Sequence, residues 1–277
     1  MKKISFEHFL NPELGKRGFR VLVIGAGGTG SSLLNHLPFL HQALLAWGFP
    51  YGLDVTVMDG DTVTETNCVR QAFSKADIGK NKATLLIHRI NLFYGLEWKA
   101  VPRYFSQVMN DRSGNSIRPL SGIDLVIGCV DSRKARREIN AAVTSNQYGV
   151  SYYLDLGNGA STGQYILGQP LNGRNKRSAE RMRTVAELYP EILAHEEDPQ
   201  PSCSAIEALE AQEPFVNQSL AISALALLTR LFRYGNISHQ GGFWNAATGR
   251  MVPIPLMKPE PRRQASKAGG GVRPHTL

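Results

Sequence analysis

The feature that most constrains the fold is a glycine-rich turn between an apolar run and a helix. The run "RVLVIG", Arg20–Gly25, is rich in β-branched residues and predicts a buried strand, and "SSLLNHLPFLHQALLAWG" has apolar residues at helical spacing. Small residues between a strand and a helix let backbone N–H groups approach a phosphate, and the helix dipole favours the negative charge. The turn therefore predicts nucleotide binding. Its glycines are Gly25, Gly27, Gly28 and Gly30.

Strands and helices alternate along the rest of the first 160 residues. Further strands are expected at Leu53–Asp59, "EWKAVPRYF", Ile123–Asp131 and "VSYYLDLGNG", and helices at Lys80–Asn91 and "SRKARREINAAVTSN". This alternation predicts an α/β fold, a doubly wound Rossmann-like and mostly parallel sheet with helices on both faces. A final helix closed by Gly235 and the hairpin "GGFWNAATGRMVPIPL" add antiparallel C-terminal strands. Pro38 should kink or break the first helix.

The composition changes along the chain and suggests four segments. We expect a nucleotide-binding α/β core at 1–169 and a mobile crossover-type connection at 170–203, which is polar, charged and long for an irregular loop. Residues 204–257 are expected to supply C-terminal helices and strands that complete the same domain. The stretch 258–277 is poor in apolar residues and rich in Gly, Pro and charge, so we expect a disordered tail.

Charge and cysteine content exclude several classes of protein. The net charge is +8, but 258–277 holds five basic residues against one acidic residue, so the charge is local and nucleic-acid binding is not expected. No apolar run is long enough for a signal peptide or a membrane span. The three cysteines show no C-x-x-C spacing, so neither a disulfide framework nor a structural zinc is expected. We expect a soluble, cytoplasmic protein.

Polar residues between 59 and 82 favour one nucleotide chemistry over another. Asp59 ends a strand, where a carboxylate accepts hydrogen bonds from ribose hydroxyls. Hydride transfer by a NAD-dependent oxidoreductase, the alternative at this point, has no use for cations beside the phosphates. Arg70 and Lys82 suit the neutralisation of charge on phosphate oxygens when pyrophosphate leaves. Asn67 is a neutral donor for a phosphate or ribose oxygen, and Asp131 ends a strand where it could hold Mg²⁺.

The motifs "GAGGTGS", "DGDTVTETNCVRQ", "DIGKNKA" and "CVDSRKARREIN" resemble, in order, those of the ThiF/MoeB and ubiquitin-activating-enzyme superfamily. The segment "DPQPSCSAIEALEAQEPFVNQSLA" resembles the ThiF family protein of bacterial PRTRC systems. The resemblance implies an enzyme that binds ATP and Mg²⁺ and adenylates the C-terminal glycine of a ubiquitin-like or sulfur-carrier protein. It also implies a homodimer.

The resemblance assigns roles to residues whose motif positions match. Catalytic roles fall on Arg70 and Lys82, and the metal role on Asp131. Nucleotide contacts fall on the four glycines together with Asp59, Asp61, Asn67, Arg70, Gln71, Lys82 and Asp131. Two features depart from the family pattern: the N-terminus has Arg17 and Arg20 but no R-Q motif, and the paired C-x-x-C zinc motif is missing.

Cys203 is the candidate for a covalent step. Ser204 and Glu207 fit a capping box, which places Cys203 just before a helix, where the positive end of the helix favours a thiolate. A thioester with the adenylated partner is then possible, and a small buried cysteine is the alternative. Cys68 and Cys129 are expected to be packing residues. A non-catalytic activating-enzyme-like subunit remains a further alternative.

Overall fold

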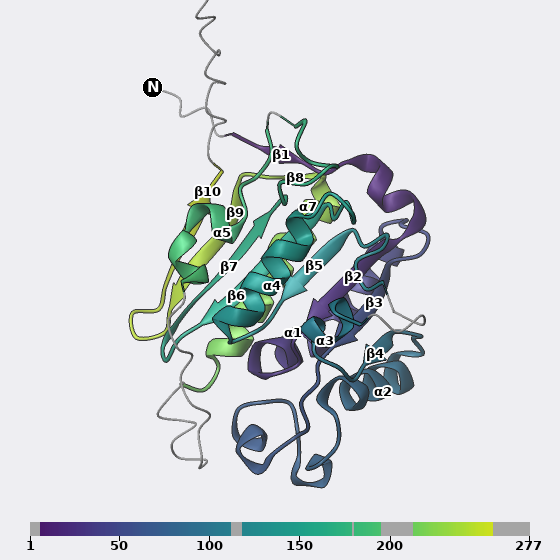
Figure 1. Ribbon diagram of the computed structural model, residues 1–277, viewed down its shortest axis with the longest axis vertical. Helices are drawn as coiled ribbons and strands as arrows, with labels where there is room; N and C mark the ends of the chain where they lie inside the picture. The colour runs from purple at the N-terminus through teal and green to yellow at the C-terminus, as the bar shows by residue number, and fades with distance from the viewer. Residues whose placement is uncertain (1–5, 112–117, 179, 195–212, 257–277) are drawn as a thin grey trace, which may run out of the picture.

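The computed structural model describes residues 6–111, 118–178, 180–194 and 213–256, and its centre is an eight-stranded sheet with helices on both faces (Figure 1). In order across the sheet the strands are β10 (Arg250–Pro255), β9 (His239–Asn245), β7 (Thr162–Gly168), β6 (Tyr152–Asn158), β5 (Leu125–Gly128), β2 (Phe19–Ile24), β3 (Leu53–Met58) and β4 (Lys99–Val101). A two-stranded ladder joins β1 (His8–Phe9) to β8 (Asn236–Ile237).

The strand order reverses its direction between β2 and β5. Strands β2 to β6 are parallel, and the chain moves outward from β2 through β3 to β4 before it returns to the other side of β2 at β5. Ligands of doubly wound sheets bind at the carboxyl ends of the strands where the order reverses in this way. The strands β7, β9 and β10 are antiparallel. The predicted fold class is confirmed.

Each face of the sheet has its own core because successive side chains of a strand point to opposite faces. In β2, Val21 and Val23 pack with the residues of one hydrophobic cluster, and Leu22 and Ile24 with those of the other. The first cluster includes residues of helices α1 (Gly28–Ala46), α2 (Lys82–Tyr94) and α7 (Val216–Tyr234). The second includes residues of α3 (Phe105–Met109), α4 (Arg133–Thr144) and α5 (Val185–Leu188).

The remaining helical elements are short 3₁₀ turns: η1 (Pro12–Arg17), η2 (Glu65–Val69), η3 (Lys75–Asp77) and η4 (Pro190–Leu193). In the part of the chain that the structure describes, we find no helix with the length and apolarity of a membrane span.

Helix α1 continues through Pro38, so the expected break is wrong. A proline removes one helical hydrogen bond at a cost of about 3 kcal/mol. The helix buries a row of leucines on either side of this residue, and each fully buried leucine contributes roughly 1.5–3 kcal/mol. The row comprises Leu33, Leu34, Leu37, Leu40 and Leu44. The free energy gained by burying this row exceeds the cost of the lost hydrogen bond.

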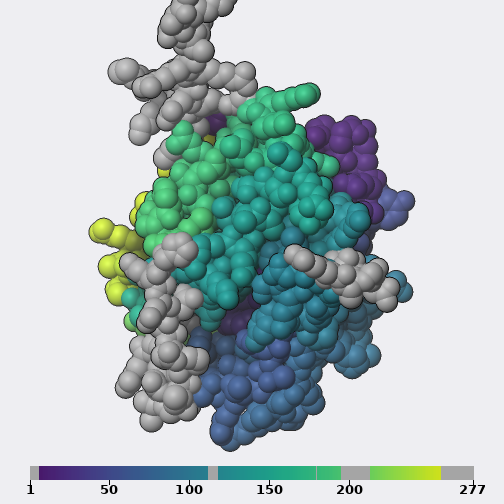
Figure 2. All heavy atoms as spheres, viewed as in Figure 1, coloured from purple at the N-terminus to yellow at the C-terminus, as the bar shows by residue number. Residues whose placement is uncertain are grey.

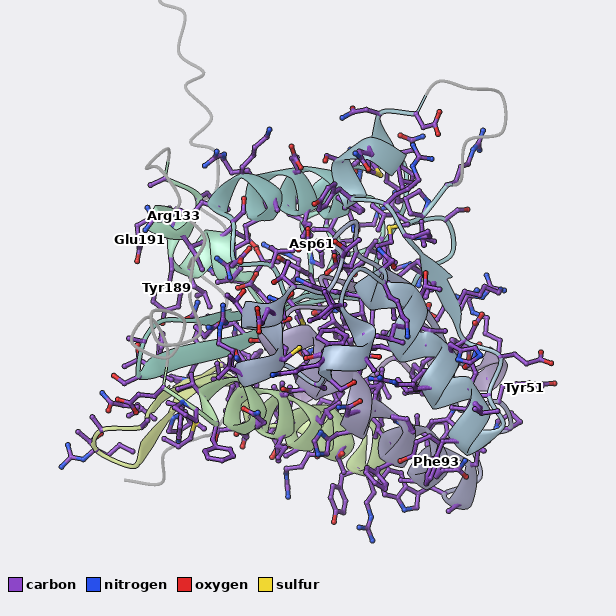
Figure 3. The ribbon with its side chains drawn as sticks, turned by 90° about the horizontal axis from the view of Figure 1, so that it is seen from below. Tyr51, Asp61, Phe93, Arg133, Tyr189 and Glu191 are labelled. Atoms are coloured by element: carbon purple, nitrogen blue, oxygen red, sulfur yellow. The ribbon has the colours of Figure 1, made fainter. Side chains whose placement is uncertain are left out.

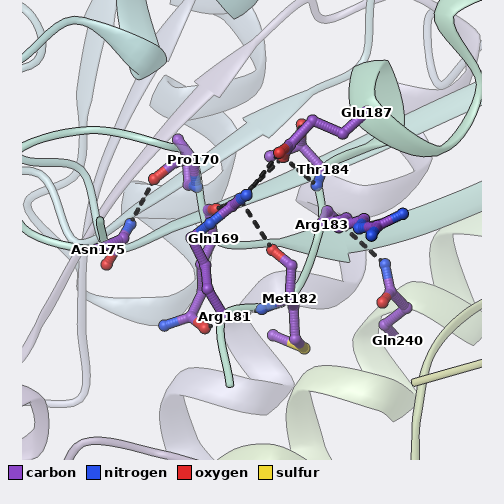
Figure 4. Close-up of polar contacts among 9 residues, drawn as sticks. All are labelled: Gln169, Pro170, Asn175, Arg181, Met182, Arg183, Thr184, Glu187 and Gln240. Carbon is purple, nitrogen blue, oxygen red and sulfur yellow. Dashed lines mark hydrogen bonds and ion pairs between the residues drawn. The ribbon is translucent and has the colours of Figure 1, made fainter. Parts of the chain in front are cut away.

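The first part of the connection after β7 is held by polar contacts (Figure 4). Arg181 donates to the Gln169 carbonyl at 2.6 Å and pairs with the Glu187 carboxylate at 2.5 Å, and Gln240 donates to the Arg183 carbonyl at 2.8 Å. The buried Asn175 donates to the Pro170 carbonyl at 3.0 Å. Three predicted parts lie outside the described residues: the end of the connection at 195–203, the helix expected just after Cys203, and the tail 258–277. The division of the chain into four segments stays a prediction.

A buried histidine near the N-terminus makes stability depend on pH. His8 Nε2 lies 2.9 Å from the Tyr152 hydroxyl, and burial lowers the pKa of His8 from 6.5 to about 4. Between these values the unfolded chain binds a proton that the folded chain does not, so the free energy of unfolding falls as pH falls from 6.5 toward 4. The loss from this residue amounts to about 3 kcal/mol.

Urea unfolding measured from pH 7 to pH 4 checks this expectation. The variant His8→Gln should have a flatter pH profile than the wild type, and His88→Gln, at an exposed position of α2, should keep the wild-type profile. Parallel profiles for the wild type and His8→Gln would contradict it.

Candidate active site

The glycine turn lies at the carboxyl end of β2 and is closed on two sides. Gly25 has φ +96° and donates to the Met58 carbonyl at 2.9 Å. A Cβ on Gly25 would lie 2.5 Å from the Cys129 carbonyl oxygen, and one on Gly30 would lie 2.0 Å from the Gly25 carbonyl oxygen. A Cβ on Gly27, the N-cap of α1, would meet nothing within 4 Å. The turn is therefore packed at Gly25 and Gly30 and open at Gly27.

The surface is hollowed near this turn. Figure 2 shows purple atoms of the early chain at the base of a hollow, between the teal atoms of the middle of the chain and the blue atoms that follow β3. This is the position that the strand order predicts for a ligand.

Asp59 joins the glycine turn to the turn that follows β3. One of its carboxylate oxygens accepts the Ala26 N–H at 2.5 Å, and the other accepts the Asp61 N–H at 2.7 Å. Burial raises the pKa of Asp59, and these two hydrogen bonds oppose the increase. The carboxylate at the predicted ribose position is thus held by the backbone on both sides.

Lys82 belongs to the same cluster. It is the first residue of α2, and its Nζ lies 3.1 Å from a carboxylate oxygen of Asp61. Asn81 caps α2 by accepting the Thr84 N–H at 2.9 Å, and its side chain donates to the carbonyls of Asp59 and Asp61. The Lys82 side chain is 7% exposed, whereas that of Lys80 is 58% exposed. Of the two lysines, Lys82 is the one built into the site.

The loop that contains η2 is attached to the first turn of α1, because the Ala72 N–H donates to Ser31 Oγ at 3.4 Å. Asn67 caps η2 through its side-chain oxygen, which accepts the Thr64 N–H at 3.0 Å. A bond from Asn67 to a nucleotide would therefore come from its amide nitrogen. Arg70 is half-buried, and Gln71 Oε1 is buried and accepts no hydrogen bond within the described residues.

Asp131 is exposed in the turn between β5 and α4. Arg136 holds this turn: it donates to the Val130 carbonyl at 2.9 Å and pairs with the buried Asp155 at 3.0 Å. Within the described ranges no group of three or more His, Cys, Asp or Glu residues could hold a metal ion. Mg²⁺ at nucleotide sites is commonly held by one or two carboxylates together with substrate phosphates and water. A single exposed aspartate fits that mode of binding.

The structure therefore brings most of the predicted residues together. Hydrogen bonds run without interruption from the glycine turn through Asp59 and Asp61 to Lys82, and the loop with Asn67, Arg70 and Gln71 is attached to α1. Cys203 lies outside the described residues. The roles of all these residues in binding and catalysis stay predictions.

The other two cysteines are in packed positions. Cys129 is buried, and burial raises the pKa of its thiol; Cys68 is half-buried, with its Sγ 3.7 Å from the Thr64 carbonyl.

Sequence reasoning missed the contact between α7 and the first turn of α1. The Thr29 hydroxyl donates to Asn217 Oδ1 at 2.8 Å and lies 3.2 Å from Asn158 Oδ1. A Cβ on Gly28 would lie 2.3 Å from Asn217 Nδ2, so the small size of Gly28 accommodates α7. No local signal identifies Asn217, which is far from the glycine turn in the sequence.

Fold and site together define a doubly wound α/β protein with a glycine turn, carboxylates and cations gathered where its parallel strands end. Residues 15–267 match the model of the ThiF family, and the chain belongs to that family. The resemblance to the ThiF/MoeB and ubiquitin-activating-enzyme superfamily is confirmed. Closeness to the PRTRC-system protein stays a prediction.

Two curated proteins are similar to part of the chain. The adenylyltransferase and sulfurtransferase UBA4 of Yarrowia lipolytica is 28% identical over 137 residues, which are 48% of this chain and 30% of that protein. The ubiquitin-activating enzyme E1-like protein of Saccharomyces cerevisiae is 31% identical over 125 residues, 45% of this chain and 18% of that protein. The chain thus spans less than a third of the length of either relative.

Solved structures show the same fold. Crystal structures of PaaA and of E. coli MccB with AMPCPP and MccA match with TM-scores of 0.57 and 0.56, at 13% and 14% identity. Each match covers 86% of this chain and 64% of the other.

Proposed function

We propose that this protein binds ATP and Mg²⁺ and adenylates the C-terminal glycine of a ubiquitin-like or sulfur-carrier protein. One observation carries the proposal: a buried lysine, Lys82, is connected through Asp61 and Asp59 to a glycine turn with open space at Gly27. Hydride transfer needs no cation there. Membership of the ThiF family and similarity to an adenylyltransferase support the assignment.

In the proposed reaction the carboxylate of the partner's last glycine attacks the α-phosphate of ATP. A bond forms between the carboxylate oxygen and the α-phosphorus, the bond to the β-phosphate oxygen breaks, and pyrophosphate leaves with the electron pair. No proton transfer is required, because a C-terminal carboxyl group is ionised at neutral pH. Negative charge grows on the phosphate oxygens, and cations already in position lower the barrier.

The charged residues of the site and Gly27 each have one part in this proposal. Arg70 presents a planar fork to phosphate oxygens and Lys82 a point charge. Asp59 accepts hydrogen bonds from the ribose hydroxyls, and Asp61 orients the ammonium group of Lys82. Asp131 would hold Mg²⁺, which supplies further neutralisation of the phosphate charge. Gly27 leaves room for a phosphate beside the backbone.

A groove on the antiparallel part of the sheet supports a peptide tail as the substrate. It has a volume of about 410 Å³, and its lining includes Gln164, Phe243, Asn245 and Val252. The register pairs Gly163 and Gln164 of β7 with Asn158 and Gly157 at the end of β6. Gln164 Nε2 and Arg136 Nη2 both lie against Gly157, and Arg136 of α4 holds the turn that carries Asp131, so the groove leads from the sheet surface toward Asp131. An extended C-terminal tail fits this path.

ATP–pyrophosphate exchange tests the proposal. Exchange should be stimulated by a small protein that ends in Gly-Gly, and Asp131→Ala should reduce it by about 10²-fold or more. Asp54→Ala, which removes an exposed aspartate from the other end of the parallel strands, should leave it unchanged. Absence of exchange with every partner would instead favour a non-catalytic subunit, and binding of NAD in place of ATP would favour an oxidoreductase.

The later step is a separate proposal. Transfer of the acyl group to Cys203 as a thioester, with release of AMP, predicts that Cys203→Ala keeps full exchange but forms no covalent complex with the partner. A homodimer is also proposed on the family resemblance alone.

A further inference from the structure

Tyr104 lies beside the candidate site, in the turn that follows the outer strand β4. It follows β4 and is the N-cap of α3, so it lies at the same sheet edge as the turn that carries Asp59 and Asp61. Its hydroxyl donates to Asp61 Oδ1 at 2.5 Å. The hydrogen bond to Asp61 and burial raise the pKa of Tyr104 to about 12, so the hydroxyl remains a donor at neutral pH.

The ring of Tyr104 is held at two points and is still accessible. A Cβ on Gly60 would lie 2.8 Å from the ring atoms Cγ, Cδ2 and Cε2, so the ring rests against the Gly60 backbone. With the hydroxyl bound to Asp61, neither end of the side chain is loose. Tyr104 is nevertheless 48% exposed. An aromatic ring that is fixed and half open to solvent is a suitable surface for stacking.

We propose that Tyr104 is the stacking platform for the base of the bound nucleotide, an inference that rests on the proposed function. In a doubly wound fold the phosphates lie at the first glycine turn and the ribose at the acidic residue that ends the next strand. At this site these are the turn after β2 and Asp59 after β3. The base is attached to the far side of the ribose, and β4 with Tyr104 is the next strand in that direction. Stacking of a base on an aromatic side chain changes affinity by roughly five- to a hundredfold.

The competing explanation is that only the hydroxyl matters, because it orients Asp61 and through it Lys82. The two explanations predict different affinities for ATP when phenylalanine replaces Tyr104. Phenylalanine keeps the ring and loses the hydroxyl, whereas leucine and alanine lose both. They also predict different affinities for a ligand that has no base, because the loss of stacking cannot change the binding of such a ligand.

Calorimetric titration of ATP and of inorganic tripolyphosphate into four variants and the wild type makes the comparison. Tyr104→Ala and Tyr104→Leu should lower the affinity for ATP by about tenfold or more and change the affinity for tripolyphosphate by less than about twofold. Tyr104→Phe should keep the affinity for ATP within about threefold of the wild-type value. Tyr51→Ala is the matched control, because Tyr51 is 65% exposed and well separated from Asp61 in Figure 3. It should bind both ligands as the wild type does.

Three results would overturn the inference: unchanged ATP affinity in Tyr104→Leu, equal losses in Tyr104→Phe and Tyr104→Leu, or parallel losses of ATP and tripolyphosphate. If Tyr104→Ala does not fold, the phenylalanine and leucine variants still distinguish stacking by the ring from orientation of Asp61 by the hydroxyl. A wild-type protein that binds no ATP overturns the proposed function itself. That outcome differs from a wild type that binds ATP without help from Tyr104.

Discussion

Replacing Lys82 with methionine is expected to reduce ATP–pyrophosphate exchange by about 10²- to 10³-fold, the range measured when one preorganised electrostatic donor is removed. Methionine keeps most of the length of the buried side chain and removes only the charge. Under the proposed function this charge acts on the phosphate oxygens as pyrophosphate leaves, so kcat should fall more than the affinity for ATP. Steady-state exchange rates over a range of ATP concentrations separate the two effects.

Lys80→Met is the matched control. Lys80 lies two residues earlier, its side chain is 58% exposed, and its Nζ is 3.9 Å from Asp77. Its loss should change exchange by less than about twofold, because its ammonium group is exposed and faces Asp77 of η3, away from Asp59 and Asp61. The Asp61 side chain is 46% exposed, so it stays hydrated without Lys82 and the protein should remain folded. Equal effects of the two substitutions would exclude Lys82 from the chemistry.

The second large effect is expected at Gly30. Alanine there would place its Cβ 2.0 Å from the Gly25 carbonyl oxygen, a backbone atom that cannot move without opening the turn. We expect a loss of about 3 kcal/mol or more in the free energy of unfolding. Urea unfolding of Gly30→Ala beside the wild type measures this loss.

Gly27→Ala separates binding from folding in the same turn. A Cβ at Gly27 meets nothing within 4 Å, so the variant should unfold at nearly the wild-type urea concentration. If a phosphate approaches the backbone there, the methyl group should lower the affinity for ATP by about tenfold or more. Wild-type affinity for ATP in Gly27→Ala would contradict the proposed placement of the nucleotide. Wild-type stability of Gly30→Ala would contradict the closed turn.

Much of the fold could be predicted because its signals are local. The β-branched run of β2, the glycines after it and the alternation that follows indicate a doubly wound sheet without any knowledge of distant contacts. The predicted strand Leu53–Asp59 is β3, Leu53–Met58, and Gly235 closes α7 in the left-handed conformation, with φ +72°. Asp59, Asp61 and Lys82 could be placed in one site because parallel strands end at the same edge of the sheet.

Residues outside these motifs could not be found in this way. Asn217 meets Thr29 only because α7 packs beside α1, and Tyr104 reaches Asp61 only because β4 pairs with β3. Local rules also failed at Pro38, where burial of the surrounding leucines outweighs the proline penalty. The oxygen of Asn67 caps η2, a use that is compatible with the donor role predicted for its side chain but that the motif did not reveal.

The two hydrogen bonds that hold Asp59 have a consequence for recognition. The N–H groups of Ala26 and Asp61 join the glycine turn after β2 to the turn after β3 through one carboxylate. The orientation of this carboxylate therefore depends on both turns. Substitutions in either turn should alter how well different sugars are accepted at the ribose position.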